Sequence, residues 1–412
     1  MKDLLERCMG LDVHKESVVA CLMSGPVDCK AEKETRTFGT LIADMQKLRR
    51  WVEETDCRYV AMESTGIYWQ PIYETLEDCF GGDIDLLVVN ARHMKNVPGK
   101  KTDIRDSEWI ATLLRAGLLN GSFIPAKDIR ELRHLTRYRK SVISDVTSQK
   151  NRIEKFLQSS GFRLSSFMSD IFGVSGRNVM RYLCQHGKVT MEALDGCLKT
   201  QTRNRINEIM ASVNGTLSNH QRQFLSMMLS HLEMLEQHRK EVEDAISAEI
   251  DKHSEALALL RSIPGIDITA AASIIAEIGT DMSKFPTAQH ICSWAGLSPG
   301  NNESAGKKKR ASIGKGNPYI KSMLCEVAWV VAGKRNTYLS GWYWRIKQQK
   351  NSKRAVVALA RKLLAIIYTM LKTKTQYNED CFEERKKKCE RRRTDRLIHE
   401  LTMLGFKVEP PA

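Results

Sequence analysis

Apolar and polar positions alternate in two different ways along the first part of the chain. The stretch 7–24 is apolar with a polar turn inside it and predicts two short strands, and further strands are predicted at 36–38, 59–63 and 85–89. Helical spacing covers 41–54 and 68–79. Alternating strands and helices predict an α/β domain over roughly the first 125 residues, which we bound at 1–127.

A different period follows. Apolar residues recur at spacings of three, four or seven in two separate stretches, which is the pattern of a coiled-coil seam. The two sets are Leu132, Leu135, Val142, Val146, Ile153 and Phe156, and Leu225, Met228, Leu232, Leu235, Val242 and Ile246. We therefore predict a helical coiled-coil region over 128–258 with two long antiparallel arms. Dimerisation or clamping and plain helical packing both explain this pattern.

The third part of the chain combines apolar helices with a loop rich in glycine and lysine. Helices are predicted near 317–333 and 352–373, within a mostly α domain at 259–375. Residues 262–272 (SIPGIDITAAA) resemble a helix-hairpin-helix turn, although Asp267 replaces the more usual second glycine. A purely structural turn between helices fits equally well. The basic tail, 376–412, is expected to form either a solvated helix or a nucleic-acid arm.

Charge separates the last quarter of the chain from the rest. The 412 residues carry a net charge of +15, and residues 301–412 hold 26 Lys and Arg against 10 Asp and Glu. Such an excess favours a polyanionic partner over a merely solvated tail. The sequence has no apolar run of membrane-spanning length and no apolar signal core, so we expect a cytoplasmic protein without membrane contact. Its 11 cysteines include no C-x-x-C pair, which argues against zinc fingers.

Four acidic residues occupy positions that could meet. Asp12 lies in the middle of an apolar strand, Glu63 ends a second one, and Asp103 and Asp106 lie three apart at the start of a helix, hence on one face. Converging carboxylates repel each other unless a cation such as Mg²⁺ binds between them, and two metals can clamp a phosphodiester. Each acid alone is better explained as an ordinary structural residue. Their order along the chain resembles the ribonuclease H-like arrangement of RuvC-like nucleases.

A serine-containing basic loop offers a second kind of chemistry. The segment 294–318 contains three serines, several glycines and the cations Lys307, Lys308, Lys309, Arg310 and Lys315. Glycine lets backbone N–H groups approach a phosphate, and the cations neutralise it. A serine hydroxyl here could attack a phosphodiester and form a covalent link to DNA. The same composition also suits a phosphate-binding loop without covalent chemistry.

The motifs together resemble one family, the insertion-sequence-one-hundred-ten transposases, also described as DEDD transposases and bridge-RNA-guided serine recombinases. The N-terminal motifs are GLDVHK, AMESTG and KTDIRD. The C-terminal ones are SIPGI, FPTAQHICSWAGLSPGNNES, GKGN and AVVALARKLLAIIY. The resemblance covers most of the chain and implies a RuvC-like DEDD domain at 1–127 and a C-terminal transposase domain at 259–375.

The resemblance also implies roles for individual residues. Asp12, Glu63, Asp103 and Asp106 would bind Mg²⁺, and Ser304, five residues after the proline of GLSP, would be the nucleophile. Ala305 follows Ser304 where the family has glycine, so Ser298 and Ser312 stay open as nucleophiles.

The implied function is RNA-guided cutting and exchange of DNA strands for an insertion sequence. Its partners would be donor and target DNA, a noncoding bridge RNA and further copies of the chain in a dimer or tetramer, and it would associate with the nucleoid while acting. Two alternatives differ in chemistry. One is a metal-dependent RuvC-like nuclease of the Holliday-junction-resolvase type using activated water, and the other is a non-catalytic nucleic-acid-binding scaffold.

Overall fold

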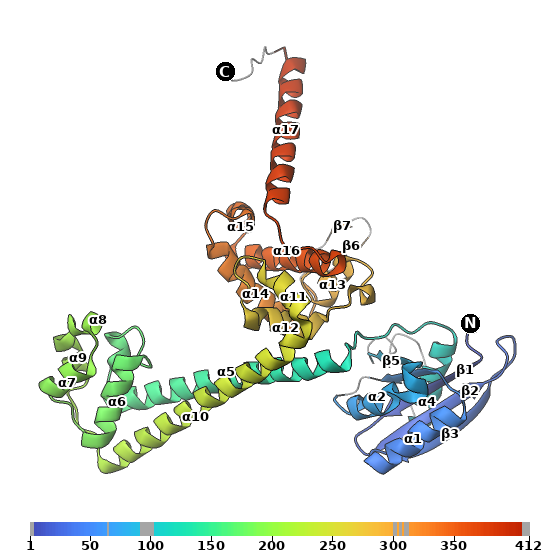
Figure 1. Ribbon diagram of the computed structural model, residues 1–412, viewed down its shortest axis with the longest axis horizontal. Helices are drawn as coiled ribbons and strands as arrows, with labels where there is room; N and C mark the ends of the chain where they lie inside the picture. Colours follow the sequence, from blue (N-terminus) through green and yellow to red (C-terminus); the bar gives the residue numbers. More distant parts are fainter. Residues whose placement is uncertain are drawn as a thin grey trace. The chain divides into compact units, whose positions relative to one another are not determined.

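The computed structural model describes residues 4–63, 66–90, 103–299, 303–304, 307–308 and 313–405. It divides into two compact units, residues 1–124 and 125–412 (Figure 1). The first unit is built on a mixed sheet and the second is almost entirely helical. In the part of the chain that the structure describes, no helix combines the length and apolarity needed to cross a bilayer.

The sheet of the first unit confirms the predicted strands and extends the third. Its strands are β1 (Arg7–Val13), β2 (Ser17–Ser24), β3 (Glu32–Gly39), β4 (Tyr59–Glu63) and β5 (Asp85–Val89). They lie in the order β3-β2-β1-β4-β5, with β2 antiparallel to both neighbours and β1, β4 and β5 mutually parallel. The sheet therefore places β1 and β4 side by side at its centre.

Helices cover both faces of this sheet. Successive side chains of β1 point to opposite faces, so they belong to two different hydrophobic cores. Met9, Leu11 and Val13 pack on one face with α1 (Ile42–Glu54) and α2 (Trp69–Glu77), which is followed by η1 (Cys79–Gly82). Cys8 and Ala61 pack on the other face with α4 (Asp103–Arg115). Because α4 covers this face of the sheet, a charged side chain on the same face must lie outside the part that α4 covers.

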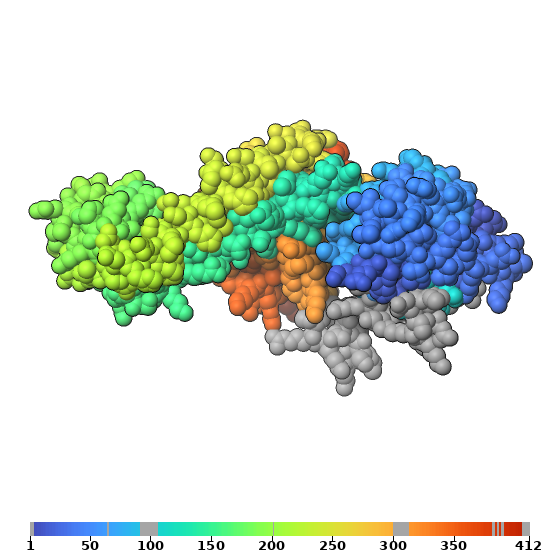
Figure 2. Space-filling model, turned by 90° about the horizontal axis from the view of Figure 1, so that it is seen from below, coloured from blue at the N-terminus to red at the C-terminus, as the bar shows by residue number. Residues whose placement is uncertain are grey.

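Two long helices form the first part of the second unit, as the seam pattern predicts. They are α5 (Lys127–Ser159) and α10 (Asn219–Ile250), and they lie side by side (Figures 1 and 2). As residue numbers rise along α5, the numbers of the contacting residues in α10 fall. The Tyr138 hydroxyl lies 2.9 Å from His238 Nε2, and Gln149 Nε2 donates to the Met228 carbonyl at 2.9 Å. The pair is antiparallel and lies within one chain; association between chains stays a prediction.

Short helices fill the connection between α5 and α10. Most of them pack with both long helices around one hydrophobic cluster that includes Ile153, Leu183 and Leu225. The elements are η2 (Leu164–Ser166), α6 (Val174–His186), α7 (Met191–Cys197), α8 (Thr200–Arg203) and α9 (Ile206–Ser212). This cluster accounts for the buried apolar residues of the segment between the two long helices.

The rest of the second unit consists of further helices and one small antiparallel pair of strands. The elements are η3 (Asp251–His253), α11 (Ser254–Arg261), α12 (Ile268–Ile278), η4 (Met282–Lys284), α13 (Ala288–Trp294), β6 (Glu303–Ser304), β7 (Lys307–Lys308), α14 (Pro318–Gly333), α15 (Tyr338–Gln349), α16 (Ser352–Thr373) and α17 (Asp380–Met403). The tail is thus largely the helix α17, whose described side chains are exposed.

The turn between α11 and α12 is closed by its own acid. Asp267 accepts a hydrogen bond from the Ala270 N–H at 2.7 Å and caps α12. A capping carboxylate occupies the N–H groups that a phosphate would use at this helix end. The residue that departs from the helix-hairpin-helix pattern therefore has a structural role at the start of α12.

Candidate functional site

Asp12 and Glu63 lie at the same end of adjacent parallel strands. Leu11 of β1 is paired with Met62 of β4, so the two acids are the next residues along each strand. Asp12 is the penultimate residue of β1, closer to the strand end than its sequence context suggests. It is only 5% exposed, and its Oδ2 lies 3.2 Å from His14 Nε2, whereas Glu63 is half-buried.

The helix α4 crosses β1 with backbone contact. A Cβ atom added to Gly10 would lie 2.4 Å from both the Ser107 carbonyl oxygen and the Ala111 nitrogen, so only glycine permits this approach. Cys8 Sγ donates to the Ala111 carbonyl at 3.4 Å. As the residue number in β1 rises from Cys8 to Gly10, the contacting residues of α4 therefore have lower numbers.

The same geometry brings the first turn of α4 toward Asp12. Asp12 is the next residue of β1 after Gly10 on this face of the sheet. One turn before Ser107, α4 spans Asp103 and Asp106. The two steps correspond because two strand residues and one helix turn cover similar lengths. Asp106 lies four residues before Ile110, which is 1% exposed and faces the sheet. All four acid positions are thus at one end of the sheet, on one face.

Carboxylates at these positions suit a hard divalent cation. The side chain of Asp103 lies outside the described residues. Among the side chains that the structure does describe, no group of three His, Cys, Asp or Glu residues is close enough to hold a metal ion. The donor set is nevertheless all oxygen, which is the set that Mg²⁺ prefers. Bringing several carboxylates to one edge is costly without a compensating positive charge.

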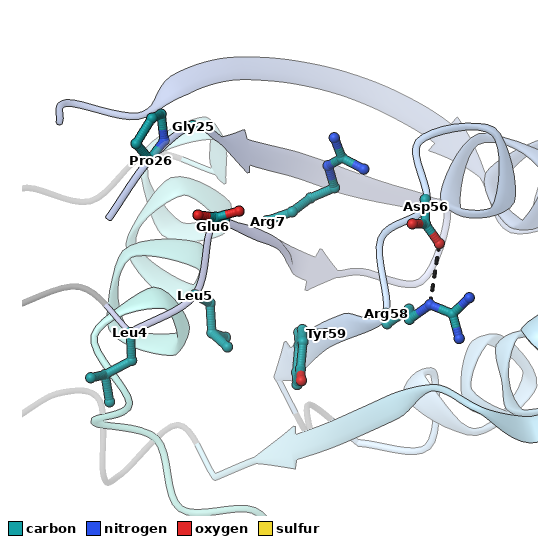
Figure 3. A pocket seen from close by; sticks show the side chains of 9 residues that line it. All are labelled: Leu4, Leu5, Glu6, Arg7, Gly25, Pro26, Asp56, Arg58 and Tyr59. Atoms are coloured by element: carbon teal, nitrogen blue, oxygen red, sulfur yellow. Dashed lines mark hydrogen bonds and ion pairs between the residues drawn. The ribbon is translucent and has the colours of Figure 1, made fainter. Parts of the chain in front are cut away.

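A pocket in the first unit lies at the other end of these strands (Figure 3). It contains the ion pair between Arg58 Nε and Asp56 Oδ1, 3.2 Å apart. Its lining residues are Leu4, Leu5, Glu6, Arg7, Gly25, Pro26, Asp56, Arg58 and Tyr59. Arg7 and Tyr59 begin β1 and β4, whereas Asp12 and Glu63 end or nearly end them, so this pocket is separate from the acidic cluster.

The serine loop belongs to the second unit, and its two ends are held together. Gly316 has a φ of +47°, and a Cβ there would lie 2.2 Å from the Gly296 nitrogen. Pro299 and Ile313 form an isolated bridge, and the Asn317 N–H donates to the Trp294 carbonyl at 3.3 Å. The loop between them therefore leaves and re-enters the fold at one place.

The predicted loop residues are only partly described. Ser304 lies in β6, where its backbone pairs with that of Lys307 in β7, beside Lys308. Ser312, Lys309 and Arg310 lie outside the described residues, as do the side chains of Ser304, Lys307 and Lys308. Lys315 is exposed. The Ser298 hydroxyl is buried and has no hydrogen-bond partner in the part of the chain that the structure describes.

A buried glutamate anchors the end of this loop, and the sequence analysis did not identify it. Glu277 is 2% exposed and accepts from Arg137 Nε at 2.7 Å and from Asn317 Nδ2 at 2.6 Å. Asn317 in turn caps α14 by accepting from the Tyr319 N–H at 2.9 Å. A single acid in the apolar helix ITAAASIIAEI was the available signal, but it does not reveal partners that lie far away in sequence.

A second arginine completes this anchor. Arg133 donates to the carbonyls of Ala276 and Glu277, each at 2.8 Å, at the last turn of α12. Burial lowers the pKa of Arg133 to about 10, although the Glu277 carboxylate opposes that shift. The long helix α5, helix α12 and the loop end are thus joined by one polar network.

Comparison with known proteins identifies the class. A model of DEDD transposases matches residues 9–161 and includes all four acids. A second model, described as the transposase IS116/IS110/IS902 family, matches residues 257–344 and includes the serine loop. The chain is therefore a transposase. It belongs to the IS110 family.

Proteins from several bacteria are similar in sequence to this chain. A transposase for the insertion sequence element IS1111A of Coxiella burnetii is 23% identical over 388 residues, 92% of each chain. A transposase named y4qE of Sinorhizobium fredii is 24% identical over 388 residues, 90% of this chain and 83% of its own. The pilin gene-inverting protein of Moraxella bovis is 32% identical over 128 residues, 30% of this chain and 39% of its own.

Replacing the buried glutamate tests the anchor. We expect Glu277→Ala to lower the free energy of unfolding by about 3 kcal/mol, because two arginines lose their buried counter-charge. Glu326→Ala, which removes an exposed acid of α14, should change it by less than about 0.5 kcal/mol. Urea unfolding of the full chain measures both values. Equal stabilities of the two variants would show that the network does not hold this part of the fold.

Proposed function

We propose that the protein cuts and exchanges DNA strands with a Mg²⁺-binding acidic site and a serine nucleophile, guided by a noncoding RNA. The observation that supports it most is the crossing of α4 over Gly10, which gathers the positions of Asp12, Glu63, Asp103 and Asp106 at one end of the sheet. Membership of a transposase family supports a DNA substrate. The relative from Moraxella bovis, by its name, inverts a pilin gene.

The first unit in this proposal is a ribonuclease H-like, RuvC-like domain. Its strand order β3-β2-β1-β4-β5, with β2 alone antiparallel to the other four, supports this assignment. Asp12 and Glu63 on the central strands and the acids of α4 would hold the cation. Bound there, Mg²⁺ would polarise a phosphodiester and stabilise negative charge that develops on its oxygens.

The serine loop supplies the nucleophile. The Ser304 hydroxyl oxygen would attack phosphorus, breaking the bond to one strand oxygen, which departs as a hydroxyl, while Ser304 gives up its proton. The cations Lys307 to Arg310 would neutralise the phosphate during this step. Attack of the freed hydroxyl of another strand on the phosphoserine would then rejoin DNA and release the serine. Strand exchange without net hydrolysis follows from this balance.

Removing one carboxylate charge tests the metal role. We expect Asp12→Asn to reduce strand exchange at least ~100-fold, because even indirect changes around metal ligands cost 10–100-fold. The substitution keeps the side-chain volume, so the melting temperature should stay close to that of the wild type. Asp85→Asn, an exposed acid at the opposite end of the sheet, is the matched control. Undiminished exchange by Asp12→Asn would exclude the proposed metal site.

Replacing the serine separates the proposed mechanism from hydrolysis by activated water. We expect Ser304→Ala to eliminate both strand exchange and the covalent protein–DNA adduct, which denaturing gel electrophoresis with end-labelled element DNA detects. Ser298→Ala and Ser312→Ala should still form the adduct. Continued cleavage by Ser304→Ala would favour the water-activating nuclease, and loss of the adduct in Ser298→Ala or Ser312→Ala alone would move the nucleophile there.

A further inference from the structure

Two tryptophan side chains on α14 and α15 lie half exposed beside one buried ring. Trp329 is 52% exposed and Trp344 is 50% exposed. Their ring centroids lie 6.2 Å and 5.5 Å from the ring of Tyr343, which is 1% exposed. The Tyr343 hydroxyl lies 3.1 Å from Ser352 Oγ of α16. Both exposed rings therefore pack against the same buried ring, which its hydroxyl contact with α16 helps to fix.

These rings lie in a segment of one charge sign. Residues 327–378 contain eleven Lys and Arg and no Asp or Glu. Lys347 Nζ lies 4.3 Å from the Trp344 ring centroid, and Arg345 and Lys350 at the same end of α15 are exposed. We call Trp329, Trp344, Arg345, Lys347 and Lys350 the tryptophan platform.

The platform adjoins the turn between α11 and α12. A Cβ on Gly265, whose φ is +101°, would lie 3.2 Å from a methyl carbon of Val330, the residue after Trp329. Val330 is itself 50% exposed. The apolar surface thus extends from Trp329 through Val330 to the tight turn at Gly265. The cations of the platform lie on α15.

The combination of flat rings and a basic segment without acidic residues limits what can bind. A second copy of this chain would bring the same acid-free segment against itself, and like charges would oppose that contact. A duplex offers phosphates but keeps the faces of its bases stacked inside. A single strand offers both phosphates and free base faces, and base stacking on aromatic side chains beside Lys or Arg is a known basis for binding such strands.

We propose that the tryptophan platform binds unpaired nucleotides of a DNA or RNA strand by stacking. Trp329 and Trp344 would each contact the face of a base, and Arg345, Lys347 and Lys350 would contact the phosphates between them. This inference goes beyond the proposed strand exchange, because the platform contains none of the four acids and no part of the serine loop. It assigns a second nucleic-acid contact to the chain, separate from Lys307–Arg310 and Lys315.

Fluorescence anisotropy with the full-length protein tests the platform. The probes are labelled oligo(dT), oligo(U) and a mixed-sequence DNA duplex of equal length, each measured over the same series of salt concentrations. We expect Trp329→Ala and Trp344→Ala each to weaken binding of single strands about 5- to 100-fold and binding of the duplex by less than about twofold. The salt dependence should stay unchanged, because no charge is removed.

Two further variants separate stacking from general damage. Trp344→Tyr keeps a flat ring and should restore most of the affinity that Trp344→Ala loses. Phe224→Ala removes a 42% exposed aromatic ring from α10 and should bind like the wild type. A loss confined to oligo(dT) or to oligo(U) would support the platform and identify which strand it takes.

Three results would overturn the platform. Single-strand affinities of both alanine variants within twofold of the wild type would exclude stacking. Equal losses on single strand and duplex would show a general defect. A smaller mass of either variant in light scattering, with unchanged single-strand binding, would assign the surface to a second copy. The assay involves no strand cleavage, so its failure would leave the proposed chemistry standing.

Discussion

The close contact between α4 and β1 at Gly10 determines where the chemistry of the first unit can lie. Any side chain at that position would meet the backbone of α4 at 2.4 Å, so the helix could not lie as near the sheet. The contact also fixes which turn of α4 reaches the ends of β1 and β4. Asp12 and Glu63 then lie toward the start of α4, and carboxylates at one end of the sheet favour a compensating positive charge, which in the proposed function is Mg²⁺.

The second unit uses glycine contact and a buried polar network for a similar purpose. Gly296 and Gly316 approach so closely that the two ends of the serine loop enter the fold together. Glu277 then ties Asn317, the residue after that contact, to Arg137 of the long helix α5. Fixed loop ends suit the proposed role of this loop, because positioning of a reacting group contributes much of the rate.

Local sequence patterns predicted the elements well and their partners poorly. The strands 59–63 and 85–89 and the helix 352–373 have the predicted bounds, because a continuous apolar pattern decides each of them. Helix α15 was not predicted, since only Leu339, Ser340 and Tyr343 are buried in it and no apolar stripe marks it. Adjacency of β1 and β4, and the contacts of Glu277, depend on residues far apart in sequence. The family came from motifs and the comparisons confirm it.

The most direct test of this account is a crystal structure with Mn²⁺ in place of Mg²⁺, using anomalous scattering to find the ion. The account predicts an anomalous peak within about 2.0–2.3 Å of carboxylate oxygens from Asp12, Glu63 and the first turn of α4. Carboxylates of Asp12 and Glu63 directed to separate places, or Mn²⁺ bound only elsewhere on the protein, would contradict it.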